Sequence, residues 1–375
     1  MLVLASGEVF AGRGFGATQP AVGEVVFNTA LTGYQEIVTD PSYRGQLVCM
    51  TCTHIGNVGV NDLDCESEAP QVSGLIVREL TRTTSSWRAQ GNLADFLADA
   101  GVAGIEGLDT RALTRRLRSG GAANGCIIAA ADVERGLQMA RDCPPMAGCN
   151  LAGQAAALDA SAAAAGEWSA ATNQYAAPEL ADAPTVAVID CGCKRAIARE
   201  LAGRGLKPVA LPYGATAADL ADLNADGILL SNGPGDPQPL AEAIALIKQL
   251  LEGNTPLLAI CLGHQALALA AGGEAVKMKF GHHGSNHPVI EHQSGKVMIS
   301  SQNHGFAIDA KSIPQDFEIS HSSLFDGTVQ GLRHKSKPFA SFQGHPEASP
   351  GPREMRFAFD RFAASVTSHA QTRRR

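Results

Sequence analysis

A cysteine at a predicted strand-to-helix turn is the first residue of the chain that could do chemistry. The apolar run 256–260 predicts a short strand, and the Ala/Leu-rich segment after it predicts a helix that stops at Gly272. Cys261 stands at the turn between them, where the first N–H groups of the helix are free to point at a ligand. These groups favour a thiolate. We therefore expect a nucleophile, and a buried core cysteine is the alternative.

A histidine and a glutamate two residues apart could complete a catalytic group. Pro346 disfavours the helical conformation at His345, so the tripeptide is extended and its first and third side chains can lie on one side. Glu347 could then hold one imidazole nitrogen while the other accepts the thiol proton. A triad of Cys261, His345 and Glu347 is therefore stereochemically available, although the tripeptide alone also fits an ordinary turn.

Alternating strands and helices precede the cysteine and would position it. Strands are predicted at 185–190, 207–211, 227–230 and 256–260, with helices at 194–203, 217–223 and 240–251. This alternation is typical of a parallel sheet covered by helices on both faces. Ligands bind at the carboxyl ends of such strands, so the loop 232–237 and Cys261 should face one crevice. Further strands are predicted at 288–290, 296–299, 317–319, 329–332 and 339–343.

The first 150 residues predict a smaller domain that is rich in strands. Strands with glycine-rich turns are expected at 1–4, 12–16, 23–27 and 46–50, and helices at 91–100 and 109–118. Asp40, Pro41 and Ser42 form a turn signal. A cluster of arginines is expected to form a solvated face rather than an anion site: Arg115, Arg116 and Arg118.

Alanine, serine and proline dominate residues 151–184, which we interpret as an irregular connection between a domain at 1–150 and a second domain at 185–371. The three arginines at 373–375 are expected to be exposed and disordered.

Composition limits the classes of function. A length of 375 residues predicts two domains. The net charge of −7, with acidic and basic residues interleaved, provides no basic field for nucleic acid and little attraction to a membrane. No signal peptide and no run of 18 apolar residues is found, so a soluble, cytoplasmic protein is expected. Nine scattered cysteines fit reduced thiols, and Cys49 and Cys52 are expected to be structural.

Several motifs resemble those of one protein family. The segments CLGHQ (261–265), GHPE (344–347) and NGPGDP (232–237) resemble the class I, or triad, glutamine amidotransferases. The segments 278–288, 301–306 and 322–328 are similar to the small, glutamine-hydrolysing subunits of carbamoyl-phosphate synthetases. The segments 23–29, 32–36, 39–43 and 54–58 extend this similarity over nearly the whole chain. The resemblance implies an α/β protein: an amidotransferase domain with an open, mostly parallel sheet flanked by helices, preceded by a smaller α/β domain rich in strands.

The resemblance also implies a role for individual residues. Cys261 would attack the side-chain amide of glutamine, His345 would act as general base and then acid, and Glu347 would orient His345. The N–H groups of Gly233 and Leu262 would form an oxyanion hole. By position within the motifs, glutamine would be held by Ser42, Gly233, Gly235, Leu262, Gln265, Asn303, Gly305 and Phe306. Since Ser42 belongs to the first domain, a cleft between the domains is expected.

A partner follows from the same resemblance. Ammonia would pass through a protected tunnel to a large ATP-grasp subunit, which makes carbamoyl phosphate from bicarbonate and ATP for arginine and pyrimidine synthesis. ATP and Mg²⁺ are expected on that subunit, because this chain has no Walker-type glycine loop. No metal or cofactor is expected in this chain. The two subunits would form a heterodimer, which could assemble further.

Two other functions stay open from the sequence alone. The chain could serve another acceptor, as in anthranilate or GMP synthesis, although those amidotransferases lack a domain like residues 1–150. It could also be a catalytically silent regulatory subunit, against which the intact triad argues. Ala259 departs from the glycine that the family commonly has two residues before the nucleophile. His282, His283 and His287 suggest a metal site by number only, and a structural loop role is favoured.

Overall fold

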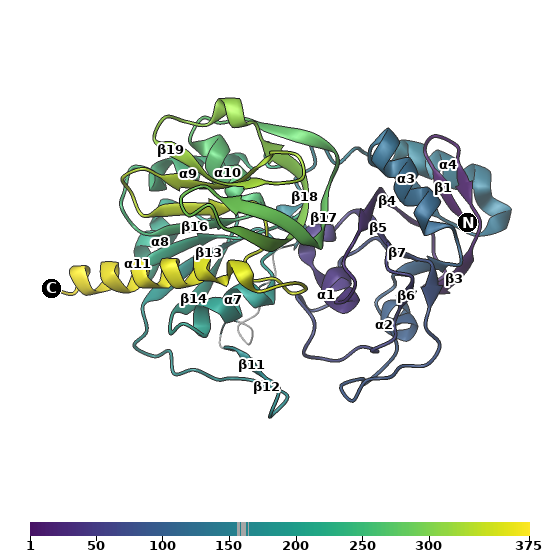
Figure 1. The fold of residues 1–375 in the computed structure, drawn as a ribbon, viewed down its shortest axis with the longest axis horizontal. Helices are drawn as coiled ribbons and strands as arrows, with labels where there is room; N and C mark the ends of the chain where they lie inside the picture. The colour runs from purple at the N-terminus through teal and green to yellow at the C-terminus, as the bar shows by residue number, and fades with distance from the viewer. Residues whose placement is uncertain (156–157, 159–162, 164) are drawn as a thin grey trace. The chain divides into compact units, whose positions relative to one another are not determined.

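The computed structural model describes residues 1–155, 158, 163 and 165–375, and it forms two compact units (Figure 1). Unit 1 contains residues 1–149 with the short segments 278–285 and 349–351. Unit 2 contains residues 150–277, 286–348 and 352–375. Each unit is built on a large sheet with helices, and the first unit is rich in strands. The predicted α/β fold class is confirmed.

Unit 1 has an eight-stranded sheet in the order β2-β1-β10-β4-β5-β7-β9-β3. The strands are β1 (Leu2–Leu4), β2 (Val9–Phe10), β3 (Arg13–Gly16), β4 (Ala21–Asn28), β5 (Gln46–Met50), β7 (Gly74–Val77), β9 (Ala103–Glu106) and β10 (Ala123–Ile127). The helices are α1 (Tyr34–Thr39), α2 (Leu93–Asp99), α3 (Thr110–Gly120) and α4 (Val133–Asp142), and a small parallel pair is formed by β6 (His54–Ile55) and β8 (Glu79–Leu80). The four strands β4, β5, β7 and β9 are parallel.

Side-chain alternation along β5 gives the sheet of unit 1 a helix-covered core on each face. Leu47 and Cys49 belong to the core that includes Leu113 and Leu117 of α3. Val48 and Met50 belong to the core that includes residues of α2. Burial raises the pKa of the Cys49 thiol to about 12, which fits the structural role expected for it.

The helices and the turn predicted in unit 1 are present and are capped by side chains. Asp109 Oδ1 accepts a hydrogen bond from the Ala112 N–H at 2.9 Å and begins α3. In the same way Asn92 caps α2. Asp40 Oδ1 accepts the Ser42 N–H at 2.9 Å, which holds Pro41–Tyr43 in a 3₁₀ turn.

Unit 2 has a nine-stranded sheet in the order β14-β13-β15-β16-β21-β20-β19-β17-β18. The parallel strands are β13 (Thr185–Asp190), β14 (Lys207–Pro212), β15 (Gly227–Leu230), β16 (Leu257–Ile260) and β21 (Phe339–Phe342). Antiparallel strands continue the sheet with β20 (Val329–His334), β19 (Phe317–Ser323) and β17 (Ala275–Glu291), and β18 (Val297–Ile308) lies at the edge. The helices are α7 (Arg195–Ala202), α8 (Ala217–Leu223), α9 (Ala241–Leu250), α10 (Leu262–Ala270) and α11 (Phe357–Arg373).

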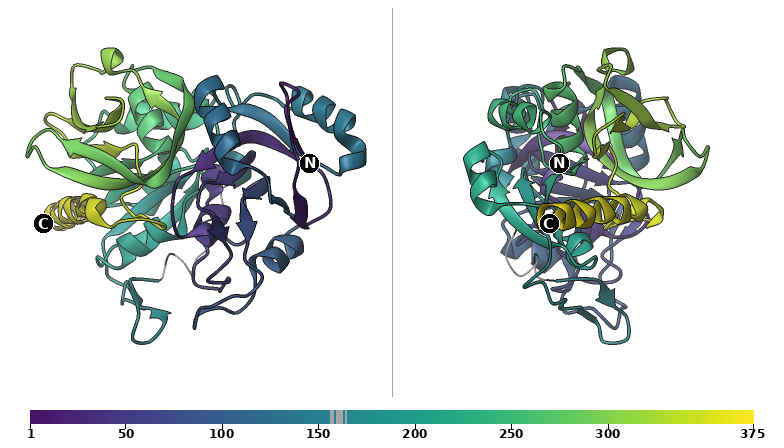
Figure 2. Two further views of the ribbon diagram at one scale, coloured as in Figure 1. Left: turned by 45° about the vertical axis from the view of Figure 1, so that its right-hand side comes forward. Right: turned by 90° about the vertical axis from the view of Figure 1, so that its left-hand side faces the viewer.

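Helices cover both faces of the parallel strands, as the sequence predicts. Residues of α9 and α10 pack in one core with Leu230 and Ala259. Residues of α7 and α11 pack in another core with Leu229 and Leu258. The yellow helix α11 runs along the outside of the unit 2 sheet (Figures 1 and 2). Ala259 is fully buried, so the extra methyl group relative to glycine is accommodated in the first core.

One helix in the second half of the chain is missed by the sequence analysis, and two expectations there are wrong. The missed helix is α11, which has 17 residues and buries Phe359, Phe362 and Val366 at helical spacing. The tail is not disordered throughout, because Arg373 lies in α11 and its Nη1 donates to Asp226 Oδ1 at 3.1 Å. The strands β17 and β18 are longer than predicted, so the three histidines at 282, 283 and 287 lie in a strand rather than a loop.

The connection predicted at 151–184 contains some regular structure. It includes the short helix α5 (Ala152–Ala155) and a hairpin of β11 (Trp168–Ser169) and β12 (Gln174–Tyr175). Residues 156, 157, 159–162 and 164 of this predicted connection lie outside the described residues. All nine cysteines are free thiols. No helix in the described part of the chain is both long and apolar enough to cross a membrane.

Candidate active site

Cys261 stands at a strained turn between β16 and α10. Its φ of 53° and ψ of −105° are rarely adopted by a residue with a side chain, and such strain is commonly found at active sites. The Cys261 N–H donates to Phe342 O at 2.8 Å, and the Gly263 N–H donates to Ser231 O at 3.0 Å. These bonds hold the turn against both neighbouring strands. As the first helical residue, Leu262 has an N–H without a partner within α10.

Two glycines let the backbone close around this turn. A Cβ at Gly263 would lie 2.4 Å from Leu230 O, and a Cβ at Gly233 would lie 2.2 Å from Cys191 O and 2.9 Å from Leu262 Cδ2. Only glycine fits at such distances. The loop after β15 therefore passes directly beside the first residue of α10. Gly235, in the same loop, has a φ of 96°, which also favours glycine.

His345 and Glu347 reach the same sheet edge because β21 is the parallel neighbour of β16. The register pairs Ile260 with Phe342, so the residues that follow each strand emerge at the same end. His345 Nδ1 donates to Glu347 Oε1 at 2.6 Å, and both side chains are buried. The His345 N–H donates to Ser301 O at 2.9 Å, which ties this segment to β18.

The electrostatics of the pair make His345 a strong base. Burial alone would lower the pKa of His345, but the negative charges of Glu347 and Cys261 outweigh it and raise the pKa to about 10. Burial would raise the pKa of Glu347, yet the cations Lys194 and His345 outweigh it and lower that pKa to about 2. A base of this strength can accept the proton of a nearby thiol.

Lys194 is a member of the site that the sequence analysis missed. Its side chain is buried, and its Nζ donates to Glu347 Oε1 at 3.1 Å and to Ala348 O at 2.6 Å. The Lys194 N–H donates to Asn232 Oδ1 at 3.1 Å, which links the loops after β13 and β15. The sequence did contain one indication of this role, because Lys194 follows a predicted parallel strand at the sheet edge where ligands bind.

The segment of β18 predicted to hold glutamine lies against the turn. Cys261 Sγ–H donates to Asn303 O at 3.4 Å. Gln265 Nε2 donates to Phe306 O at 2.9 Å and to Gln343 Oε1 at 3.1 Å, which joins α10 to β18 and to the residue after β21. Gly305 lies between these residues, in the same strand.

The structure thus places most of the predicted residues in one neighbourhood of unit 2. The exception is Ser42, which belongs to unit 1, so its role and the predicted cleft between the domains stay predictions.

His264 and the histidines of β17 make contacts that indicate structural rather than catalytic or metal-binding roles. His264 is fully buried, its Nδ1 is 2.8 Å from Ser341 Oγ, and burial lowers its pKa to about 3. It is therefore a neutral core residue. The ring of His283 lies 5.9 Å from that of Tyr43, and the ring of His287 lies 5.0 Å from that of Phe325. Within the described ranges, no three His, Cys, Asp or Glu residues come together in a way that could hold a metal ion.

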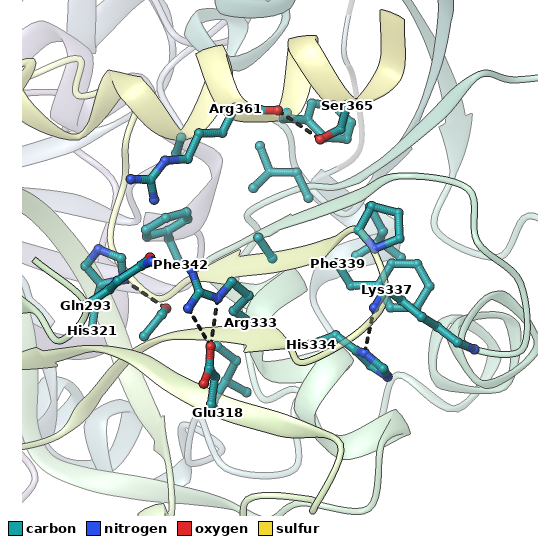
Figure 3. Close-up of a pocket in the computed structure, with 18 of the residues that line it drawn as sticks. Gln293, Glu318, His321, Arg333, His334, Lys337, Phe339, Phe342, Arg361 and Ser365 are labelled. Carbon is teal, nitrogen blue, oxygen red and sulfur yellow. Dashed lines mark hydrogen bonds and ion pairs between the residues drawn. The ribbon is translucent and has the colours of Figure 1, made fainter. Parts of the chain in front are cut away.

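The cavity drawn in Figure 3 is not formed by the triad candidates Cys261, His345 and Glu347. It has a volume of about 670 Å³ and lies between α11 and the strands β16, β19, β20 and β21. An ion pair of Arg333 with Glu318 forms part of its wall. Its described lining contains none of the three triad candidates, but it includes Phe342, whose carbonyl oxygen accepts the Cys261 N–H. The cavity therefore borders the strands that carry the site without being the site.

The buried pair of His345 and Glu347 makes the stability of unit 2 depend on pH. The pKa of His345 is raised from 6.5 to about 10 on folding, so its stabilising contribution is complete below pH 6.5 and is lost as the pH rises through 10. We expect the difference in Tm between the wild type and His345→Asn to shrink between these two values. Differential scanning calorimetry at several pH values across this range measures the two Tm values. A Tm difference that stays constant or grows would contradict the raised pKa of His345.

Comparisons with known proteins match both units. A family model described as "Carbamoyl-phosphate synthase small chain, CPSase domain" matches residues 2–127, and one described as "Glutamine amidotransferase class-I" matches residues 187–365. The carbamoyl phosphate synthase small chain of Photorhabdus laumondii is 48% identical over 378 residues, which cover 100% of this chain and 98% of that protein. The small chain of Escherichia coli strain K12 is 47% identical, over 99% of this chain and 98% of that protein.

Proposed function

Because the chain belongs to the family of carbamoyl phosphate synthase small chains, we propose that it hydrolyses glutamine with Cys261, His345 and Glu347 and supplies the ammonia for carbamoyl phosphate synthesis. The observation that carries the proposal is the position of the three residues. They follow two adjacent parallel strands, β16 and β21, and the strained Cys261 lies beside a His345 made basic by Glu347.

The first half of the reaction forms a thioester. The Cys261 thiolate attacks the side-chain amide carbon of glutamine, and the resulting oxyanion accepts hydrogen bonds from the N–H groups of Gly233 and Leu262. The imidazolium of His345 donates its proton to the amide nitrogen as the carbon–nitrogen bond breaks. Ammonia leaves, and a γ-glutamyl thioester remains on Cys261.

The second half of the reaction restores the enzyme. His345, now neutral, accepts a proton from water while the water oxygen attacks the thioester carbon. The second oxyanion collapses, the carbon–sulfur bond breaks, and glutamate leaves while the thiolate and imidazolium form again. Each cycle therefore converts glutamine and water into glutamate and ammonia. Glu347 stays ionised throughout and stabilises the imidazolium, a role supported by its contact with Lys194.

Glutamine binding is proposed for the remaining motif residues. Six of them would hold the substrate in addition to the oxyanion donors: Ser42, Gly235, Gln265, Asn303, Gly305 and Phe306. The positions of Gln265 and Asn303 beside the nucleophile support this role for the residues of unit 2. Ser42 is the one member proposed from unit 1.

A large synthase subunit is the proposed acceptor of the ammonia. It would bind ATP and Mg²⁺, make carbamoyl phosphate from bicarbonate for arginine and pyrimidine synthesis, and form a cytoplasmic heterodimer with this chain. The chain itself would need no cofactor. The match of residues 2–127 to the small-chain model supports this acceptor over those of anthranilate or GMP synthesis.

The decisive experiment measures carbamoyl phosphate formation by a large synthase subunit given ATP, bicarbonate and glutamine, with and without this chain. We expect glutamine to support synthesis only when the chain is present, whereas free ammonia should support it in both cases. If ammonia works and glutamine fails in a complex that has formed, the chain is catalytically silent and the proposal is wrong.

The oxyanion loop gives a further prediction. In Gly233→Ala the new Cβ would lie 2.2 Å from Cys191 O, so the loop must move away from Leu262. A displacement of about 1 Å at a reacting group can lower a rate about 100-fold, and we expect a loss of at least this size in kcat for glutamine hydrolysis. The control is Gly253→Ala, whose Cβ would lie 3.6 Å from its nearest neighbour. Equal activity of both variants would exclude the proposed oxyanion loop.

A further inference from the structure

A hollow lined with arginines lies in unit 1, and none of its lining residues is proposed above for catalysis or for glutamine binding. It has a volume of about 570 Å³ and is formed by the segment after β5, by the residue between β7 and β8, and by α3 with its cap. Its lining residues are Thr51, Thr53, Arg78, Asp109, Thr110, Arg111, Thr114, Arg115 and Arg118. The sequence alone favours a solvated face for Arg115 and Arg118, but the structure places both in a concave surface.

The charges of this hollow are not balanced by its own carboxylate. It contains four guanidinium groups and one carboxylate, and Asp109 already accepts the Ala112 N–H at 2.9 Å as the cap of α3. Arg78 is oriented by a hydrogen bond from its Nη1 to Leu108 O at 3.2 Å. Across the part of the chain that the structure describes, none of the four arginines forms an ion pair. In a chain of net charge −7, this is a strong local excess of positive charge.

The unpaired positive charges of α3 lie on one face of the helix. Arg111, Arg115 and Arg118 recur at helical spacing, so their like charges are neighbours and repel one another. Arg116, which is adjacent in sequence, points elsewhere and pairs with Glu8 at 2.6 Å. An anion held between the three unpaired arginines would turn this repulsion into attraction.

The lining also indicates which anion would bind. A guanidinium presents a planar fork of donors that matches two oxygens of a phosphate group. Threonine hydroxyls at Thr51 and Thr53 offer further donors at the same hollow. The volume suits a small molecule rather than a single phosphate ion. The described lining contains no aromatic ring, so a ligand would be recognised through its phosphate groups rather than by stacking of a base.

We propose that this hollow binds a small molecule that carries two or more phosphate groups, held by Arg78, Arg111, Arg115 and Arg118. None of its residues belongs to the triad or to the residues proposed to hold glutamine.

The test is calorimetric titration of the full chain with inorganic pyrophosphate in a buffer of physiological ionic strength. We expect the wild type to bind with a Kd of about 1 mM or tighter, and Arg115→Gln to weaken binding about tenfold through the loss of one charge-assisted contact. Arg116→Gln is the matched control, because it removes the same charge from the next residue of α3 but not from the hollow. Its Kd should stay within about twofold of the wild-type value.

Two results would overturn the proposal. The first is failure of the wild type to bind pyrophosphate; if Arg115→Gln then also associates more weakly with a large synthase subunit, the hollow is a docking surface for acidic side chains. The second is an equal loss of affinity in Arg115→Gln and Arg116→Gln, which would show only a general effect of net charge. A rise in Tm with pyrophosphate, seen in the wild type but reduced in Arg118→Gln, provides a second readout that supports the site.

Discussion

Cys261→Ser should abolish glutamine-dependent carbamoyl phosphate synthesis by the complex, with a loss of about 1,000-fold or more, while ammonia-dependent synthesis continues. The serine hydroxyl is far less acidic than the thiol, so His345 would no longer generate a resting anion for attack on the amide. Both activities are measured on one preparation of the complex. Acid quenching followed by mass spectrometry should detect a γ-glutamyl adduct on Cys261 in the wild type and none in the variant.

A second cysteine provides the matched control for this experiment. Cys52 is a partly exposed free thiol of unit 1, so Cys52→Ser makes the same chemical change at a residue outside the triad. It should keep wild-type activity with glutamine. Retention of glutamine-dependent synthesis in Cys261→Ser would show that the chain does not act through this thiol.

Lys194→Met should destabilise unit 2 by about 3–5 kcal/mol and strongly reduce glutamine hydrolysis, because it leaves the buried Glu347 without its fixed cation. Lys194 is the first cause that lowers the pKa of Glu347 after the opposing effect of burial, so its loss raises that pKa and weakens the hold of Glu347 on His345. Calorimetry measures the stability, and glutaminase assays measure the rate. Lys248→Met, which changes an exposed lysine of α9, is the control.

A double variant separates the structural and catalytic parts of this effect. Replacing both members of a buried ion pair is commonly far less costly than removing one of them. Lys194→Met combined with Glu347→Gln should therefore recover much of the lost stability but little of the activity. If the double variant is as unstable as the sum of the two single variants, Lys194 and Glu347 do not act as a pair.

The sequence predicted the parts of unit 2 that depend on local pattern. Short apolar runs alternating with helices gave the parallel strands, and the turn at Cys261 followed from the change of pattern beside a glycine. Pairing of β16 with β21 could not be predicted in the same way, because 78 residues separate Ile260 from Phe339. The proximity of His345 to Cys261 came instead from recognising the motifs of a family.

The features that the sequence analysis missed have physical explanations. β17 carries a histidine-rich segment and β18 a polar segment, so both lack the apolar alternation by which strands are recognised. The apolar residues of α11 do recur at helical spacing, and Phe359, Phe362 and Val366 could have revealed it. Lys194 was missed because a lysine is rarely fully buried, and its carboxylate partner is distant in sequence.

The pairing of β16 with β21 also determines how the chain can fold. Until β21 has been synthesised and docked, β16 is an unprotected edge whose residues, Leu257–Ile260, are all apolar. Such an edge is prone to pair with another chain, so a truncated or stalled product ending before Phe339 should aggregate rather than accumulate as a soluble fragment. The same delay keeps the nucleophile and its base apart until late in folding, so an incomplete chain consumes no glutamine.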